Sequence, residues 1–426
     1  MFSFNNGILR ISSDRLGLDL FIDASLFILL SSLFSATNVE GSNYFYYVAF
    51  FLFFGLTFVK LLMSLKSHGT LNVPSFTLWY GGFVLLSLAS VLWAAYPDNS
   101  MRVISRMIQS AVITFCLAQN YATRKGLLRC IHIFAWAGTV MALYMLANTP
   151  VKKWFDGFFG SSATHQNTNT LGMLFTLCVI ASFYFAFYCN EKRYYAITVL
   201  QMLIVILTSS RKSLLASVVG LAMMAMLKVQ RRNIIFRIFT ILGFVLAVYY
   251  LIMSVPELYS AIGVRMESMT EHLMGDGGDF SISLRQLFID NAKDMFYEKP
   301  LIGYGINNFV ALIYRRIGIS SYAHNNYYEI LADLGIVGFV VFYGYYFFLL
   351  FTLLKIWRNR NGSLVKMMLV WLAVIMICEY GMISYYSIYM QIALCCVYML
   401  TCAVDKEDDY TDGTPSYLKY KNSVYG

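Results

Sequence analysis

A histidine, an asparagine and a glutamate stand at the head of a long apolar run, in the stretch SSYAHNNYYEILADLGIVG of residues 320–338. A histidine can act as a base near neutral pH because its unperturbed pKa is about 6.5. If a helix begins near His324, Tyr328 follows one turn later and Asn325 lies below Glu329. The stretch also fits a polar helix cap at a membrane interface, so a base and a cap are alternative readings of His324.

Basic residues occupy two unusual places. Arg211 and Lys212 stand in ILTSSRKSLLAS, between two apolar runs with almost no loop. A charge there costs a few kcal/mol unless it faces a partner or a watery cavity, or reaches the outer head groups. Arg285 lies beside apolar residues that recur at helical spacing, where a solvated position is the alternative. Two such arginines converging on one cavity would bind a diphosphate, because the planar guanidinium grips phosphate through two bonds.

A second polar cluster, GSSATHQNTNTLG, precedes another apolar run. Its His165, Gln166, Asn167 and Asn169 could bond sugar hydroxyls, or they could form a plain loop and helix N-cap. Glu379 is a further acid in an apolar setting, where it could pair with an arginine or shape the site.

Membrane helices must position these residues. The chain is 59% hydrophobic and 13% charged, whereas soluble domains are about a quarter charged. Its apolar runs are long enough to cross a bilayer core of about 30 Å. We therefore predict an all-α polytopic membrane protein with about twelve spans, of which the first is weakest because Asp19 and Asp23 interrupt it. The expected spans are 17–36, 43–64, 75–95, 104–120, 127–147, 171–189, 193–208, 213–228, 234–254, 332–354, 364–380 and 384–404.

The sides of the membrane follow from lysine and arginine. Placing the N-terminus in the cytoplasm puts most of the 32 basic residues, Lys60 and Arg129 among them, in cytoplasmic loops. Within the one long insert, Ser283 and Gln286 have capping-box spacing and predict a helix start. The expected organisation is 1–254 for spans 1–9, 255–330 for an external loop with amphipathic helices, 331–404 for spans 10–12 and 405–426 for a cytoplasmic tail.

Several chemistries find no support in the sequence. The eight cysteines lie in or beside apolar runs without a CxxC pair, which argues against a disulfide framework or metal cage. Walker A, GxSxG and HExxH patterns do not occur in a plausible context. The net charge of +9 is spread over short loops, so a nucleic-acid partner is not expected. We expect neither a cofactor nor a metal.

Three of these motifs together resemble a known family. An outer SSR at a short helix junction, an external segment with KPLIGYGINNF, and HNNYYEILADLGIVG running into a membrane helix occur in this order. The pattern resembles the shared region of bacterial O-antigen ligases and O-antigen or capsule polymerases, of the WaaL/Wzy type. The specific part covers residues 200–345. Tyr328 departs from the family pattern, which often has leucine there.

The resemblance implies a GT-C-type fold and a metal-independent, inverting glycosyltransferase in the bacterial plasma (inner) membrane. The donor would be an oligosaccharide on undecaprenyl diphosphate, held by Arg211 and Arg285, with His324 activating the acceptor hydroxyl. Further residues that could touch the glycan or support these groups are Lys212, Asn325, Tyr328, Glu329, His165 and Asn167. The active site would face the outside, with both termini cytoplasmic.

Two transfer reactions and one transport function remain open at this stage. A polymerase would join lipid-linked repeat units on an acceptor glycan, with a chain-length regulator protein as a partner, and we favour it slightly. An O-antigen ligase would move the finished chain to lipid A core or another acceptor. A flippase or transporter of lipid-linked sugars would need charges near the middle of several spans, whereas the unusual charges here gather at one face.

Overall fold

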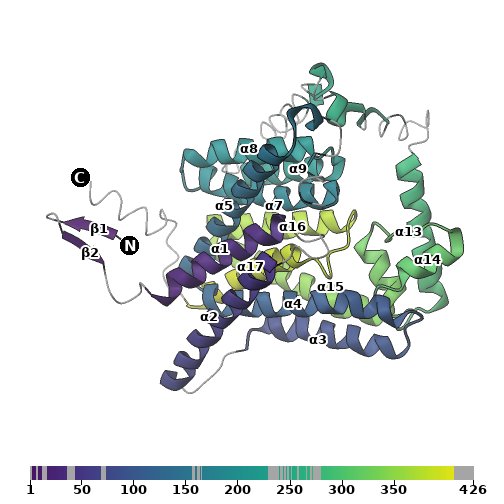
Figure 1. The fold of residues 1–426 in the computed structure, drawn as a ribbon, viewed down its shortest axis with the longest axis horizontal. Helices are drawn as coiled ribbons and strands as arrows, with labels where there is room; N and C mark the ends of the chain where they lie inside the picture. The colour runs from purple at the N-terminus through teal and green to yellow at the C-terminus, as the bar shows by residue number, and fades with distance from the viewer. Residues whose placement is uncertain are drawn as a thin grey trace.

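The computed structural model is built of α-helices gathered around a central helix, α7 (Figure 1). It describes residues 2–5, 8–11, 17–35, 44–68, 73–155, 159–160, 164, 166–228 and 280–406, and scattered positions between 239 and 271. The helices are α1 (Leu18–Ser35), α2 (Tyr44–His68), α3 (Ser75–Ala89), α4 (Pro97–Tyr121), α5 (Arg124–Asn148), α7 (Thr168–Phe187), α8 (Arg193–Leu207), α9 (Arg211–Lys228), α13 (Phe280–Glu298), α14 (Phe309–Ile317), α15 (Asn326–Arg360), α16 (Ser363–Glu379) and α17 (Ile388–Lys406).

Helix packing places the most apolar segments inside. Helix α7 is almost entirely buried, and α5, α8 and α9 pack against it. Helix α16 lies between α9, α15 and α17, while α17 also contacts α4. In contrast, α2 presents a row of exposed aromatic residues that suits lipid. Buried apolar side chains therefore form one continuous core through the bundle.

The predicted helical class is confirmed, with one exception. Strands β1 (Phe2–Asn5) and β2 (Ile8–Ile11) form a short antiparallel hairpin at the N-terminus. Every expected span has a helix except 234–254, which lies largely outside the described residues. By length and composition, 6 helices among the described residues could cross a membrane, so this count does not reach the expected twelve.

The two acids that interrupt the first span are paired. The Asp19 carboxylate accepts a 2.8 Å bond from Lys60, and Asp23 bonds Arg129 at 3.0 Å and Tyr121 at 2.7 Å. These pairs join α1 to α2, α4 and α5 at one end of the bundle. Pairing removes much of the cost of acids in an apolar helix, so α1 can pack as a core helix.

Helix α13 rests on the head of α15 through its apolar stripe. Phe288, Ala292 and Met295 are buried in a separate small core with residues of α14 and α15. The predicted capping box is wrong, because α13 already begins at Phe280. The Gln286 amide instead donates to Asp290 one turn later, at 2.9 Å.

A break in α15 fastens the external segment to it. Gly335 has φ 62° and ψ −162°, which interrupts the helix and frees backbone groups on both sides. Residues 300–305 take up these groups, with bonds such as Tyr304 N–H to the Ala332 carbonyl at 3.1 Å and Ile336 N–H to the Pro300 carbonyl at 2.8 Å.

The buried Asp333 carboxylate completes the joint. It accepts from the backbone N–H groups of Asn307, Asn308 and Phe309, at 2.6, 3.1 and 2.8 Å, where α14 begins. Three free N–H groups at a helix start suit a carboxylate. The head of α15 and the start of α14 are therefore bound together.

Candidate functional site

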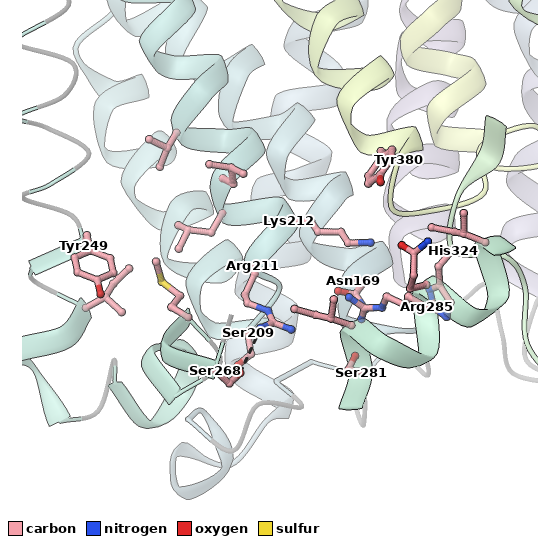
Figure 2. Close-up of a pocket in the computed structure, with 18 residues that line it drawn as sticks. Asn169, Ser209, Arg211, Lys212, Tyr249, Ser268, Ser281, Arg285, His324 and Tyr380 are labelled. Atoms are coloured by element: carbon pink, nitrogen blue, oxygen red, sulfur yellow. Dashed lines mark hydrogen bonds between the residues drawn. The ribbon is translucent and has the colours of Figure 1, made fainter. Parts of the chain in front are cut away.

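A cavity of about 610 Å³ lies between the start of α9, helix α13 and the turn before α15 (Figure 2). Arg211, Lys212, Arg285 and His324 all line it, although they are far apart in the sequence. Figure 2 shows the first two entering from α9 and the last two from the opposite side. Its described lining residues include no Asp or Glu, so the cavity suits a negatively charged ligand.

Arg211 and Lys212 owe their position to a tight turn between α8 and α9. Helix α8 ends at Leu207, Ser209 takes a left-handed φ of 55°, and α9 begins at Arg211. The Ser210 hydroxyl donates to the Asn169 side chain at 3.0 Å and lies 3.4 Å from the Ser213 N–H. The two cations thus stand on the first turn of a helix, whose N-terminal dipole adds to their attraction for anions.

The two side chains take different directions within the cavity. The Arg211 guanidinium reaches Ser268 at 3.5 Å, whereas the Lys212 ammonium donates to the Gly381 carbonyl at 3.4 Å. Gly381 follows Tyr380, which also lines the cavity. Both bonds are at the long end of the hydrogen-bond range.

Arg285 lies on the face of α13 beside its buried stripe. Ser281, Ile282, Gln286 and Ile289 of the same helix line the cavity with it. Because Phe288 anchors α13 through the small core three residues later, the Arg285 side chain is directed over the cavity rather than into solvent.

His324 stands in the turn ahead of α15, where its imidazole contacts two aromatic rings. The Tyr322 ring centroid is 3.9 Å away and the Phe288 ring is stacked at 5.9 Å. Nε2 lies 3.3 Å from the Ser321 hydroxyl. Burial, together with the charges of Arg285 and Lys212, lowers the pKa of His324 to about 3. The imidazole is therefore neutral at physiological pH, and an anion in the cavity would offset these two charges and make it a stronger base.

Two of the remaining predicted residues, Asn325 and Asn167, are helix N-caps. Asn325 caps α15 by accepting from the N–H groups of Tyr327 and Tyr328, at 3.0 and 3.2 Å. Asn167 likewise caps α7 through the Asn169 N–H at 2.8 Å. The alternative of a helix cap thus describes both asparagines, and neither lines the cavity.

Two further predicted residues, Tyr328 and Glu329, do not line the cavity. The Tyr328 ring faces the Lys293 ammonium at 5.3 Å, between α13 and α15. Glu329 is buried and accepts from the Ala323 N–H at 2.7 Å. His165 falls outside the described residues.

Glu379 has structural contacts rather than a described arginine partner. Its carboxylate accepts from the hydroxyls of Tyr346 and Ser384, at 2.7 and 2.6 Å. Sequence reasoning missed its neighbour Tyr380, whose exposed ring lines the cavity. An aromatic residue at the end of an apolar helix carries no signal of its own, because such residues are common at membrane interfaces. Among the described residues, no group of three His, Cys, Asp or Glu side chains could hold a metal ion.

Comparison with known families covers the same part of the chain. Residues 196–343 match the family model described as O-antigen ligase. The resemblance inferred from the three motifs is therefore confirmed, and the matched segment contains Arg211, Arg285 and His324. A comparison with curated proteins finds no match. The chain is thus a multi-helix membrane protein, of which residues 196–343 are similar to the O-antigen ligase family.

Proposed function

We propose that this protein is a membrane glycosyltransferase that polymerises oligosaccharide repeat units carried on undecaprenyl diphosphate. The observation that carries the proposal is the single cavity lined by Arg211, Arg285 and His324, inside the O-antigen ligase family segment. Two arginines suit the diphosphate of the donor, and a neutral imidazole suits an acceptor hydroxyl.

The reaction follows from these roles. The acceptor oxygen forms a bond to the anomeric carbon while the bond from that carbon to the diphosphate oxygen breaks. The hydroxyl proton passes to His324, and the leaving lipid diphosphate takes up the bonding electrons. Arg211 and Arg285 stabilise the negative charge that grows on this oxygen, which lowers the barrier most in the transition state. A direct attack from the opposite side inverts the anomeric centre.

The arginines make a metal unnecessary for this mechanism. A divalent cation in a sugar transferase usually neutralises the leaving diphosphate, and here two guanidinium groups beside a helix N-terminus supply that charge. The reaction as proposed uses no cofactor.

Apolar lining residues suit the carrier lipid. Leu214, Leu215 and Val218 follow Arg211 along α9 and line the same cavity, and Leu215 is exposed. A prenyl chain lying along this face would leave its diphosphate at the start of α9. The cavity therefore offers adjacent polar and apolar surfaces, as a lipid-linked sugar requires.

A ligase is the second candidate, because the matching family model carries that description. In this reaction the same donor chemistry would deliver a finished chain to lipid A core or another acceptor. Both reactions use Arg211, Arg285 and His324 in the same roles. The difference lies in the acceptor.

Deletion of the gene separates the candidates. For a polymerase, the surface polysaccharide loses its ladder of lengths, and a single repeat unit stays attached. For a ligase, long chains accumulate on the carrier lipid. If the polysaccharide is unchanged, or if only transport of the lipid-linked unit is lost, the transferase proposal fails.

A further inference from the structure

The backbone at His324 is in an unusual conformation. Its φ is 54°, in the left-handed region that residues other than glycine seldom adopt. Such a conformation is retained only where surrounding contacts hold it, and it often occurs at functional positions. Something must therefore fix the turn that carries the imidazole.

The residues on both sides of His324 are anchored. Ala323 is fully buried, and its N–H donates to the Glu329 carboxylate at 2.7 Å. Asn325 is also fully buried and caps α15 with its own side chain. His324 is thus a single residue between two fixed neighbours: the Glu329 side chain anchors Ala323, and the first N–H groups of α15 anchor Asn325.

The imidazole is aligned by the same arrangement. The Tyr322 ring lies close to the imidazole, and the Phe288 ring is stacked with it at an interplanar angle of 17°. Phe288 lies three residues after Arg285, so both side chains lie on neighbouring positions of α13. A shift of the 322–324 turn would therefore change the distance between the imidazole and the arginine.

We propose that Glu329 is a positioning residue that holds the His324 imidazole toward the cavity through the Ala323 N–H. This inference rests on the proposed function, in which His324 takes the acceptor proton. Glu329 itself does not touch the substrate, since it is fully buried and does not line the cavity.

A carboxylate is a costly choice for this position unless it has such a role. Burying a charged or strongly polar group is unfavourable unless hydrogen bonds compensate it. Glu329 Oε2 has the Ala323 N–H, whereas Oε1 has no hydrogen-bond partner among the described residues. Packing alone would favour an apolar side chain, whereas a carboxylate can hold the turn through the Ala323 N–H.

Two substitutions test this role. Glu329→Gln keeps a side-chain oxygen for the Ala323 N–H, whereas Glu329→Leu keeps only the volume. In the purified full-length protein, with undecaprenyl-diphosphate oligosaccharide as donor, we expect kcat of the Leu variant to fall about 100-fold, the effect of roughly 1 Å of misplacement. Its KM for the donor should stay close to that of the wild type, and the Gln variant should retain most activity.

A matched control uses another carboxylate of the external segment. Glu298 contacts Tyr304 and Arg316, away from the His324 turn, so Glu298→Leu should leave kcat nearly unchanged. Equal loss in the Gln and Leu variants of Glu329 would overturn the proposal. So would loss of donor binding together with kcat, which indicates a general structural role, or full activity of the Leu variant.

Chemical modification gives a second readout that needs no turnover. Diethyl pyrocarbonate acylates neutral imidazole, and mass spectrometry follows the peptide that contains His324. Loss of a buried hydrogen bond favours local opening by about tenfold, so His324 in the Leu variant should react about tenfold faster than in the wild type. An unchanged rate contradicts the positioning role. If the wild type transfers no glycan while the rate does change, the proposed function fails but the geometric role of Glu329 holds.

Discussion

The cavity brings together two guanidinium groups from separate helices: Arg211 at the start of α9 and Arg285 in α13. The type of cation is as important as its charge. Arginine presents parallel donors that match two phosphate oxygens, whereas the ammonium of lysine acts as a point charge. The proposed roles of Arg211 and Arg285 therefore depend on geometry that lysine cannot reproduce.

Replacing Arg211 or Arg285 should show this difference in kcat/KM. We expect alanine to lower it by about 100- to 1000-fold, the usual effect of removing one transition-state donor, and lysine to restore only part of the loss. Arg315→Ala is the control, because its guanidinium lies over the Tyr96 ring and does not line the cavity. Full activity of either alanine variant would remove that arginine from the site.

Lys212 should act on His324 through its charge. The native pKa of His324, about 3, lies below the ordinary 6.5 because of burial and the charges of Arg285 and Lys212. Replacing Lys212 by methionine removes one of these charges, so the pKa rises and the acid limb of kcat/KM against pH moves to higher pH. The acid limb of kcat/KM reports the pKa of the group in the free enzyme.

Lys293→Met is the matched control for this profile. Lys293 bonds Asp290, faces the Tyr328 ring and does not line the cavity, so its loss should leave the limb in place. An acid limb that stays at the wild-type pH in Lys212→Met would contradict electrostatic coupling to His324. A bound diphosphate is negative, whereas Lys212 is positive, so substrate binding should raise the pKa of His324. The acid limb of kcat should therefore lie at higher pH than the acid limb of kcat/KM.

At the scale of elements, two glycines allow the external segment and α15 to meet. Gly303 and Gly335 both have positive φ, 61° and 62°, and each packs against the backbone of the other segment. A side chain at Gly335 would collide with the Leu301 carbonyl, and one at Gly303 with that of Asp333. The positions of Arg285 and His324 relative to each other depend on this joint.

Gly335→Ala should therefore destabilise the protein. We expect a loss of about 2–4 kcal/mol from left-handed strain and collision with a backbone that cannot move aside. Gly344→Ala, in the same helix, meets nothing within 4 Å and should be neutral or slightly stabilising. Thermal unfolding in detergent compares the two, and equal midpoints would show that the joint tolerates a side chain.

At the scale of the whole molecule, the sequence predicts what depends on local pattern. Apolar runs gave the helices, and three motifs gave the residues of one cavity before their contacts were visible. The joint at Gly335 could not be predicted, because it depends on backbone groups of two distant segments. The capping box failed for a related reason: Ser283 and Gln286 have the right spacing, but the helix begins earlier at Phe280. The HNNYYEIL motif shows that a helix cap and a candidate site residue can be neighbours, because Asn325 caps α15 and His324 lines the cavity.

The side of the membrane that holds the cavity is the remaining whole-molecule prediction. Beyond the break at Gly335, residues 336–360 of α15 span about 38 Å at 1.5 Å per residue, with His324 just before the start of α15 and Asn359 near its end. If the positive-inside rule holds, Asn359 faces the cytoplasm and α13 faces outward. An impermeant maleimide should label Tyr297→Cys in right-side-out vesicles and Asn359→Cys only in inverted ones, since both positions are exposed. The parent protein gives the background, which its buried or half-buried cysteines should keep low. The reverse pattern would place the cavity in the cytoplasm, where the proposed external polymerisation could not occur.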